Sequence, residues 1–268
     1  MLRLENINFS YDEDTKALKD VTLNIEKGKK TLFLGENGSG KSTLFLIMNG
    51  LLQAQKGDIY FEGEKIKHKK KDLEDLRRKV GIIFQDPEIQ IFAPLVFQEV
   101  AYGPENLGYS KEKVEIAVNK AMEEINITDL KDRPCHHLSY GQKKRVSIAA
   151  ITAMEPELLI LDEPTTWLDS KNTKRVAEIL DNLSKAGKTL LVSTHDTDFA
   201  YEFADYIYVL EKGRIVRQGS RDEVFEDFEF LKKLNLNIPN VLKIKSYLKY
   251  KNLDENDYYK FLEEKNLL

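Results

Sequence analysis

The stretch Gly35-Glu36-Asn37-Gly38-Ser39-Gly40-Lys41-Ser42-Thr43 decides the fold. It matches the pattern Gly-x-x-x-x-Gly-Lys-[Ser/Thr], and it lies between an apolar run and an apolar helical segment at 44–48. Its glycines let backbone N–H groups curl around a polyphosphate, and the N-terminus of the next helix adds partial positive charge. Lys41 can reach the β and γ phosphates, and Ser42 can ligate Mg²⁺. The stretch predicts a nucleotide-binding α/β protein, with a merely flexible glycine loop as the alternative.

Four short runs around this loop are apolar at nearly every position: 31–34, 80–84, 158–161 and 189–193. Such runs are typical of parallel strands that helices cover on both faces. Residues 21–25 and 59–61 instead alternate between apolar and polar, which indicates antiparallel strands near the N-terminus. The alternation in the first strand slips in phase, so we expect a bulge near Glu5 and Asn6.

The rest of the chain divides into a core and two helical parts. Helical spacing at 111–125 and 139–154 predicts a mostly helical insert over about 86–154. A helix at 173–186 should end at Gly187, and 206–210 and 214–216 should form a hairpin that closes the core. We therefore predict one domain over 1–222 and a separate helical extension over 223–268. The apolar pattern of this extension includes Tyr247, Leu248, Tyr258, Phe261 and Leu262.

Composition limits the classes of function. The chain has 268 residues with 41 Lys plus Arg against 45 Asp plus Glu, and this net charge of −4 gives no basic field for nucleic acid. Its single cysteine, Cys135, excludes an internal disulfide. Arg3 and Glu5 interrupt any secretory signal, and the longest uncharged run, 42–55, is shorter than the roughly 18 apolar residues of a membrane span. We expect a cytoplasmic protein with no nucleic-acid partner.

Two adjacent carboxylates, Asp162 and Glu163, follow the apolar run at 158–161. The ends of parallel strands are where ligands bind in such sheets. Asp162 suits the metal ion, and Glu163 can orient or deprotonate the water that attacks the γ phosphate. The alternative for Glu163 is an N-cap of the next helix.

Further motifs resemble those of the ATP-binding cassette (ABC) family. Leu138-Ser139-Tyr140-Gly141-Gln142 is similar to its signature, usually Leu-Ser-Gly-Gly-Gln, and lies between the phosphate loop and the paired carboxylates. Gln85 resembles the Q-loop glutamine, residues 166–169 the D-loop, and His195 the switch histidine. The resemblance covers roughly residues 2–220. It implies a P-loop ABC ATPase with a mixed core sheet, an N-terminal antiparallel β subdomain, a helical insert and a C-terminal helical extension.

The resemblance also implies a role for each matching residue. Tyr11 would stack on adenine, with ordinary strand burial as the alternative, and residues 35–43 would bind the phosphates. Glu163, His195 and Gln85 would serve hydrolysis, and Ser42, Gln85 and Asp162 would hold Mg²⁺. A second subunit's ATP would meet Ser139, Tyr140, Gly141 and Gln142, and Asp169 would belong to the D-loop. Ser139 is expected to cap a helix whose positive end points at that γ phosphate. The alternative for His195 is a structural role.

Two residues depart from the family pattern. Tyr140 replaces a glycine in the signature, and Trp167 stands where the D-loop usually has a small residue. Ser139 and Gly141, the expected phosphate contacts, are present. We expect a working site with both bulky residues near the contact between subunits.

A closer resemblance connects residues 84–94 and 101–108 with the ATPases of energy-coupling factor (ECF) importers, those of the cobalt-import CbiO type in particular. It implies a peripheral ATPase at the cytoplasmic face of the membrane that pairs with a second ABC ATPase, either a copy or a related chain. It also implies a transmembrane coupling subunit, docked at the helical insert, and a substrate-binding membrane component. Cobalt or nickel is the leading cargo, and a vitamin is next. The extension would contact the other ATPase or pack on its own domain.

Other interpretations remain as alternatives. A soluble nucleic-acid ABC ATPase would carry a long coiled coil after Gln85 or a second cassette, and this chain has neither pattern. A non-catalytic regulatory subunit is disfavoured because Lys41, Glu163 and His195 are all present. Cys135-His136-His137 is expected to be structural or solvated rather than a cobalt site, because adjacent side chains diverge. The basic run at 67–71 is expected to be a solvated loop.

Overall fold

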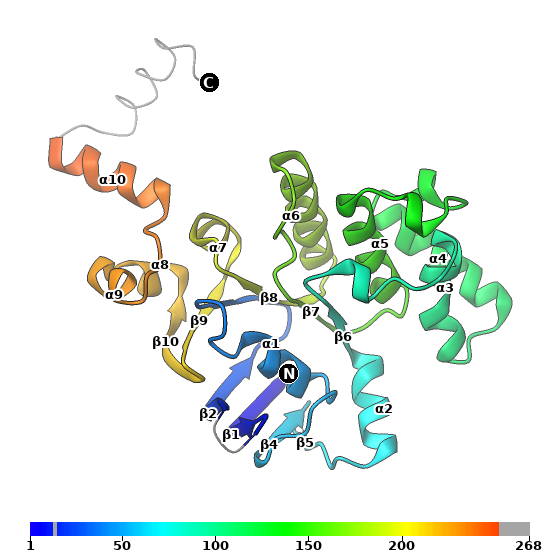
Figure 1. Cartoon of the computed structure of the whole chain (residues 1–268), viewed down its shortest axis with the longest axis horizontal. Coiled ribbons are helices and arrows are strands. Elements are labelled where there is room, and N and C mark those ends of the chain that lie inside the picture. The colour runs from blue at the N-terminus through cyan, green and yellow to red at the C-terminus, as the bar shows by residue number, and fades with distance from the viewer. Residues whose placement is uncertain (13–14, 252–268) are drawn as a thin grey trace, which may run out of the picture.

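The computed structural model describes residues 1–12 and 15–251, and it places two sheets beside a lobe of helices (Figure 1). The strands are β1 (Leu2–Ser10), β2 (Lys16–Ile25), β3 (Lys30–Leu34), β4 (Lys56–Phe61), β5 (Glu64–Lys65), β6 (Val80–Ile83), β7 (Leu158–Leu161), β8 (Thr189–Thr194), β9 (Tyr206–Glu211) and β10 (Arg214–Ser220). The α-helices are α1 (Lys41–Met48), α2 (Lys70–Lys79), α3 (Val96–Asn106), α4 (Lys111–Glu124), α5 (Tyr140–Thr152), α6 (Ser170–Lys185), α7 (Thr197–Phe203), α8 (Arg221–Phe225), α9 (Phe228–Lys233) and α10 (Asn240–Lys251). Three 3₁₀ turns, η1 (Pro87–Ile89), η2 (Thr128–Leu130) and η3 (Cys135–His137), lie around the helical lobe.

The core sheet has the strand order β10-β9-β3-β8-β7-β6. All neighbours in it are parallel except β9 and β10, which form the predicted antiparallel hairpin. The sheet is therefore mixed, as predicted. The four apolar runs of the sequence are its central and edge strands β3, β6, β7 and β8, and β10 continues four residues past the predicted end at residue 216.

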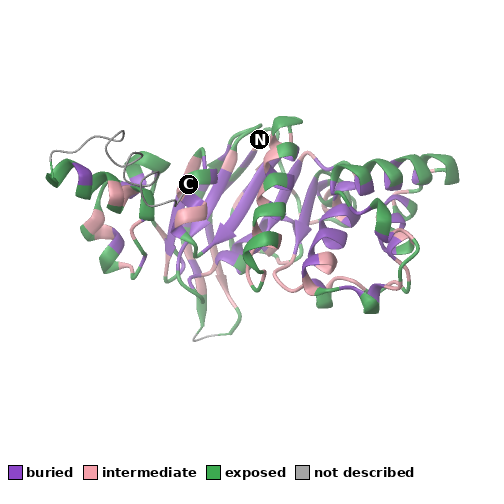
Figure 2. Cartoon of the chain, turned by 90° about the horizontal axis from the view of Figure 1, so that it is seen from above, coloured by how far each residue is buried: buried purple, intermediate pink, exposed green. Residues whose placement is uncertain are grey.

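Side chains on successive strand residues point to opposite faces, and both faces are buried. In β3, Leu32 and Leu34 join a cluster that faces α6 and α7, whereas Phe33 joins a cluster with α1 and the antiparallel sheet. Leu159 and Leu161 in β7 lie on the first face and Leu158 and Ile160 on the second. Buried strands accordingly fill the centre of Figure 2.

The N-terminal sheet has the order β2-β1-β4-β5, with antiparallel pairing throughout. The register shifts between Leu4 and Ile7, and Asn6 has a φ of 52°, which is the bulge that the phase slip predicts.

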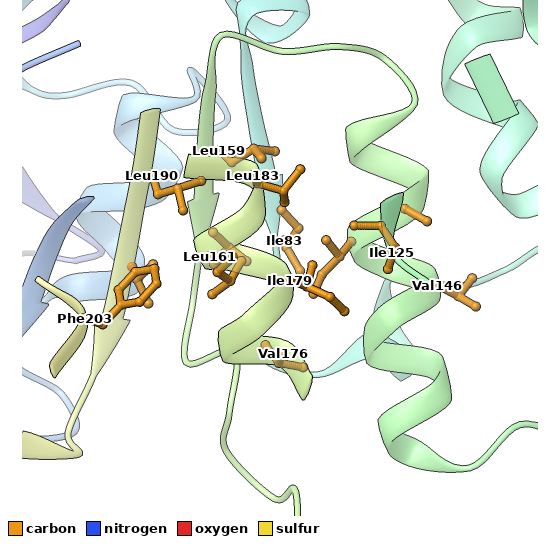
Figure 3. Close-up of a cluster of buried hydrophobic side chains, with 14 of the residues drawn as sticks. Ile83, Ile125, Val146, Leu159, Leu161, Val176, Ile179, Leu183, Leu190 and Phe203 are labelled. Carbon is orange, nitrogen blue, oxygen red and sulfur yellow. The ribbon is translucent and has the colours of Figure 1, made fainter. Parts of the chain in front are cut away.

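The insert is helical, as predicted, and its helices share the larger core. Ile125, at the end of α4, and Val146 of α5 lie close to Val176, Ile179 and Leu183 of α6 (Figure 3). This packing places α5, which begins within the signature, beside α6. Helix α6 ends where Gly187 has a φ of +89°, the left-handed conformation expected after a helix C-terminus.

The extension does not separate cleanly from the core. Val224 and Phe225 of α8 and Leu231 of α9 are fully buried in the same cluster as Ile207 and Val209 of β9. Packing on the chain's own domain thus describes α8 and α9, because their apolar side chains cover β9 and α7. Helix α10 extends away from the sheets, and most of its side chains are exposed (Figure 1).

The predicted continuation of the extension through Tyr258, Phe261 and Leu262 lies outside the described residues. Within the described residues, every helix is too short or too polar to cross a membrane. His136 and His137 are exposed on η3, and Cys135 is buried, which raises the pKa of its thiol to about 11.

Candidate functional site

The phosphate loop joins β3 to α1 and is shaped by glycines that nothing larger can replace. A Cβ atom on Gly35 would lie 2.3 Å from the carbonyl oxygen of Leu210. Gly40 has a φ of +108°, and a Cβ atom there would lie 2.7 Å from the carbonyl oxygen of Ala17. The loop therefore presents backbone N–H groups and the N-terminus of α1 in the arrangement that binds phosphate.

Lys41, the first residue of α1, is buried inside the loop. Its Nζ donates to the carbonyl oxygens of Gly35 at 2.6 Å and Glu36 at 3.1 Å, and it lies 3.9 Å from Oε1 of Glu163. Burial lowers the pKa of Lys41, and the nearby carboxylates of Glu163 and Asp162 oppose that shift. The lysine thus lies between the phosphate loop and the end of β7.

Asp162 and Glu163 follow β7 directly and are both buried. The backbone N–H of Glu163 donates to Oγ of Ser193 at 2.9 Å, and this hydroxyl donates to Oδ1 of Asp162 at 2.5 Å. Glu163 has a φ of 45°, which is uncommon for a residue with a side chain. One serine on β8 therefore holds the carboxylate of Asp162 and the backbone of Glu163. The N-cap of α6 is Asp169 rather than Glu163.

The carboxylate of Glu163 has two donors on one oxygen and none on the other. Oε2 lies 2.9 Å from Nδ1 of His195 and accepts from Oγ1 of Thr166 at 3.0 Å. Oε1 and the hydroxyl of Ser39 are buried oxygen atoms with no hydrogen-bond partner among the described residues. Buried polar atoms are normally paired, so these two are suited to a polar ligand or water.

The residues predicted for Mg²⁺ all follow the carboxyl ends of parallel strands of the core sheet, β3, β6 and β7. Gln85 follows β6, and Ile83 at the end of that strand accepts the N–H of Asp162 at 2.9 Å. Ser42 lies in the first turn of α1, directly after Lys41. All three side chains carry an oxygen atom, and a hard cation requires oxygen ligands. The residue after Asp162, Glu163, also has a buried oxygen without a hydrogen-bond partner among the described residues, which suits a polar group bound beside it. The donor set therefore fits Mg²⁺.

The signature residues cap α5. The Ser139 hydroxyl accepts from the N–H of Gln142 at 3.3 Å, while Oε1 of Gln142 accepts from the N–H of Ser139 at 2.9 Å. This capping box confirms that Ser139 begins a helix. Among the described residues, the hydrogen bonds of Ser139 stay within the first turn of α5. Its helix N-terminus therefore remains available to a group from outside the chain.

Two further predicted residues, Tyr11 and Asp169, are exposed. Tyr11 is 59% exposed, and its Oη lies 3.0 Å from Oγ1 of Thr43, so the buried alternative does not describe it. Asp169 caps α6 by accepting from the N–H of Asn172 at 2.7 Å.

The contacts of three residues were not foreseen from the sequence, although one of them, Thr166, lies in the predicted D-loop. Thr166 and Ser193 hold Glu163 and Asp162, and Lys144 donates from α5 to the carbonyl oxygens of Phe84, at 3.0 Å, and Gln85. Burial lowers the pKa of Lys144 to about 8. For two of them the pattern gives a weak indication of a special role. Ser193 is polar within an apolar strand, and Lys144 lies on a face of α5 that is otherwise buried.

Comparison with known sequences shows what this chain is similar to. Residues 18–166 match the family model described as ABC transporter. A putative ABC transporter ATP-binding protein of Methanosarcina mazei is 48% identical over 91% of this chain, which spans only 54% of that relative's length. The energy-coupling factor transporter ATP-binding protein EcfA of Methanocaldococcus jannaschii is 44% identical over 90% of this chain and 86% of its own.

Solved structures agree with these matches. CbiO1 of Clostridium perfringens, part of the ABC transporter complex cbiONQ, superposes with a TM-score of 0.79 at 39% identity, over 91% of this chain and 98% of its own. The ATP-binding cassette MJ0796, a dimer in a post-hydrolysis state bound to ADP and Pi, superposes with a TM-score of 0.75 at 30% identity, over 82% of this chain and 99% of its own.

Proposed function

The chain belongs to the ABC transporter family of ATPases, and from that premise we propose that it energises an importer of the energy-coupling factor type, most directly one for cobalt or another transition metal ion. The observation that carries the proposal is the position of the Glu163 carboxylate between Lys41 and His195. Its Oε2 lies 2.9 Å from Nδ1 of His195, and its buried Oε1 lies 3.9 Å from Nζ of Lys41 and has no hydrogen-bond partner among the described residues. The likeness to EcfA and CbiO1 supports the importer class, and the likeness to CbiO1 supports the cargo.

ATP binding follows from the phosphate loop. The N–H groups of residues 36–43 and the N-terminus of α1 bind the phosphates, and Lys41 exchanges its bonds to Gly35 and Glu36 for the β and γ phosphates. Tyr11, exposed beside Thr43, stacks on adenine. Lys41 is already buried near its target, so little reorganisation accompanies binding.

Hydrolysis depends on the carboxylate of Glu163. His195 and Thr166 occupy Oε2, so Oε1 faces the γ phosphate and accepts a proton from the attacking water. His195 holds the water or the γ phosphate. Mg²⁺, held by Ser42, Gln85 and Asp162, would neutralise charge on the phosphate oxygens. Ser193 keeps the carboxylate of Asp162 in a fixed position relative to the backbone of Glu163.

The active assembly is a head-to-tail dimer with two ATP molecules between the chains. Ser139 and Gly141 at the start of α5 meet the γ phosphate that the partner's loop holds, and the helix N-terminus stabilises its charge. Hydrolysis removes that bridge and the dimer opens. The second chain is a copy or a relative, and α10 is offered as a further contact between the two ATPases.

A groove of about 670 Å³ supplies the docking face for the transmembrane coupling subunit. It lies between α2 and the helical insert, and its apolar lining includes Leu51, Phe92, Tyr102 and Met154. Arg77 and Arg78 stand along one wall. A partner helix bound here, at the cytoplasmic face of the membrane, would move with the insert. The substrate-binding membrane component, not this chain, would then select the cargo.

The test is transport by the complete complex. The tagged chain is purified from its native membrane with its partners, reconstituted in vesicles, and assayed for ATP-dependent uptake of Co²⁺, Ni²⁺ and biotin, with Lys41→Ala as the control. We expect uptake of Co²⁺ or Ni²⁺ that Lys41→Ala abolishes. Uptake of biotin without uptake of either metal would show that the cargo is the vitamin. Recovery of nucleic acid without any membrane protein would overturn the proposal.

A further inference from the structure

The two residues that depart from the family pattern lie against each other. Tyr140 is the first residue of α5, and its ring meets that of Trp167 edge-on, with centroids 5.9 Å apart and planes at 74°. Aromatic pairs prefer this arrangement. Trp167 is 66% exposed and has a φ of 64°, a conformation that is strained for a bulky side chain. An outlier of this kind persists where its surroundings hold it in place.

Tyr140 also ties α5 to the segment after β6. Its Oη donates to the carbonyl oxygen of Gln85 at 3.3 Å, the same oxygen that Lys144 reaches one turn further along the helix. Lys143 adds an ion pair of 2.6 Å with Glu88 on η1. The start of α5 therefore sets the backbone position of Gln85.

A second contact joins the same two segments. A Cβ atom on Gly141 would lie 2.7 Å from Cγ of Asn172, so the backbone of the signature packs directly on that amide. The amide in turn donates to both carboxylate oxygens of Asp169, at 3.1 and 3.0 Å. The segments 138–142 and 166–172 thus meet at two points, a backbone contact and an aromatic pair.

We propose that Tyr140 and Trp167 are paired positioning residues that hold segments 138–142 and 166–169 in one fixed relation, so that both reach a second copy of this chain as a single surface. The inference rests on the proposed function, because it concerns the face that meets the other ATPase. With glycine at both positions, the aromatic pair would be lost and the contact of Gly141 with Asn172 would remain. The aromatic pair adds a contact between the first turn of α5 and the turn before α6.

A double-mutant cycle tests the pairing. In the Glu163→Gln chain, Tyr140→Gly, Trp167→Gly and the double substitution are compared by the ATP concentration that gives half-maximal dimer in light scattering. Trp167→Gly suits the positive φ, so it removes the ring without adding strain. Each single change should raise that concentration about 3- to 10-fold, as expected for one aromatic pair. The double substitution should raise that ATP concentration no more than the more damaging single substitution does, because each single substitution already removes the same contact.

Further variants separate positioning from folding. Tyr140→Phe keeps the ring pair and removes only Oη, so it should keep most of the dimerisation of Glu163→Gln while Tyr140→Gly does not. Ile116→Ala removes an exposed apolar side chain from α4, is the matched control, and should change nothing. Trp167 is the single tryptophan of the chain, so its emission should shift on addition of ATP in Tyr140→Phe and less in Tyr140→Gly.

The outcomes distinguish this inference from the function on which it rests. If the Glu163→Gln parent binds ATP and stays monomeric, the proposed function is overturned and the pairing with it. If the parent dimerises and the two single changes add independently, or have no effect, the pairing alone is overturned. A fall in melting temperature with unchanged dimerisation would show that the ring contact is merely structural, which also overturns it.

Discussion

Oε2 of Glu163 lies 2.9 Å from Nδ1 of His195, and this hydrogen bond joins the residues that follow two parallel neighbouring strands, β7 and β8. Oε1 is buried, has no hydrogen-bond partner among the described residues, and lies 3.9 Å from Nζ of Lys41 in the phosphate loop. A carboxylate oriented in this way can accept a proton from only one direction. Glu163 is therefore the residue on which the account of hydrolysis depends most.

Replacing this carboxylate with an amide should stop turnover and leave binding intact. In Glu163→Gln the side chain keeps its shape and cannot accept the proton, so kcat should fall by about 10²- to 10⁴-fold. ATP should then accumulate in a closed dimer visible by size-exclusion chromatography. Hydrolysis at the rate of the unaltered chain would remove Glu163 from the mechanism.

Thr166 should act through Glu163. Its hydroxyl donates to Oε2 at 3.0 Å, and a hydrogen bond to a charged group is worth about 1.5–3 kcal/mol. Thr166→Val, which keeps the shape and removes the donor, should lower kcat about tenfold or more, with KM for ATP little changed. Thr166→Ser should restore the rate. Equal rates in the valine and serine variants would show that the hydroxyl has no role.

Ser193 should support both folding and metal affinity. Ser193→Ala would leave the buried N–H of Glu163 without an acceptor and release Asp162, which should lower the free energy of unfolding by about 1–3 kcal/mol. Urea unfolding measures this loss, and the Mg²⁺ concentration for half-maximal hydrolysis should rise. Ser246→Ala on the exposed side of α10 is the control. A variant as stable as this control would mean that the serine bridge contributes nothing.

Truncation should distinguish α10 from the helices before it. Removal of residues 240–268 should leave ATP binding and melting temperature nearly unchanged and weaken association between chains. Removal of 223–268 also withdraws Val224, Phe225 and Leu231 from the core, and each large apolar side chain lost there costs about 2–5 kcal/mol. The longer truncation should therefore unfold or aggregate. A stable, ATP-binding 1–222 fragment would contradict this packing.

The sequence predicted the sheet and the phosphate loop because each is specified locally. Apolar runs of the right length mark β3, β6, β7 and β8, and glycines with positive φ mark the loop. The burial of α8 and α9 was not predictable, because an apolar helix pattern shows which face is buried and not what covers it. The same limit applies to Ser193, whose partners Asp162 and Glu163 follow β7 and become its neighbours only when β7 and β8 align. Thr166 is only three residues from Glu163, but the sequence does not show that its side chain turns back to that carboxylate.

The contact between Tyr140 and Trp167 was also not predictable from the sequence, although both residues were noticed. Both were recognised as departures from a pattern, and each was considered alone, because 27 positions separate them in the sequence. Only the packing of α5 beside the turn before α6 brings their rings to 5.9 Å.

The central claim is that each ATP is held by the phosphate loop of one chain and the signature of another, and mixed dimers test it most directly. Lys41→Ala disables the loop, and Ser139→Asp still caps α5 while repelling a γ phosphate. Each variant alone should be inactive. Co-expressed with two different tags and purified through both, the mixed dimer contains one loop and one signature that are intact and face each other, so it should regain ATP hydrolysis. A mixed dimer as inactive as its parents would contradict the shared site.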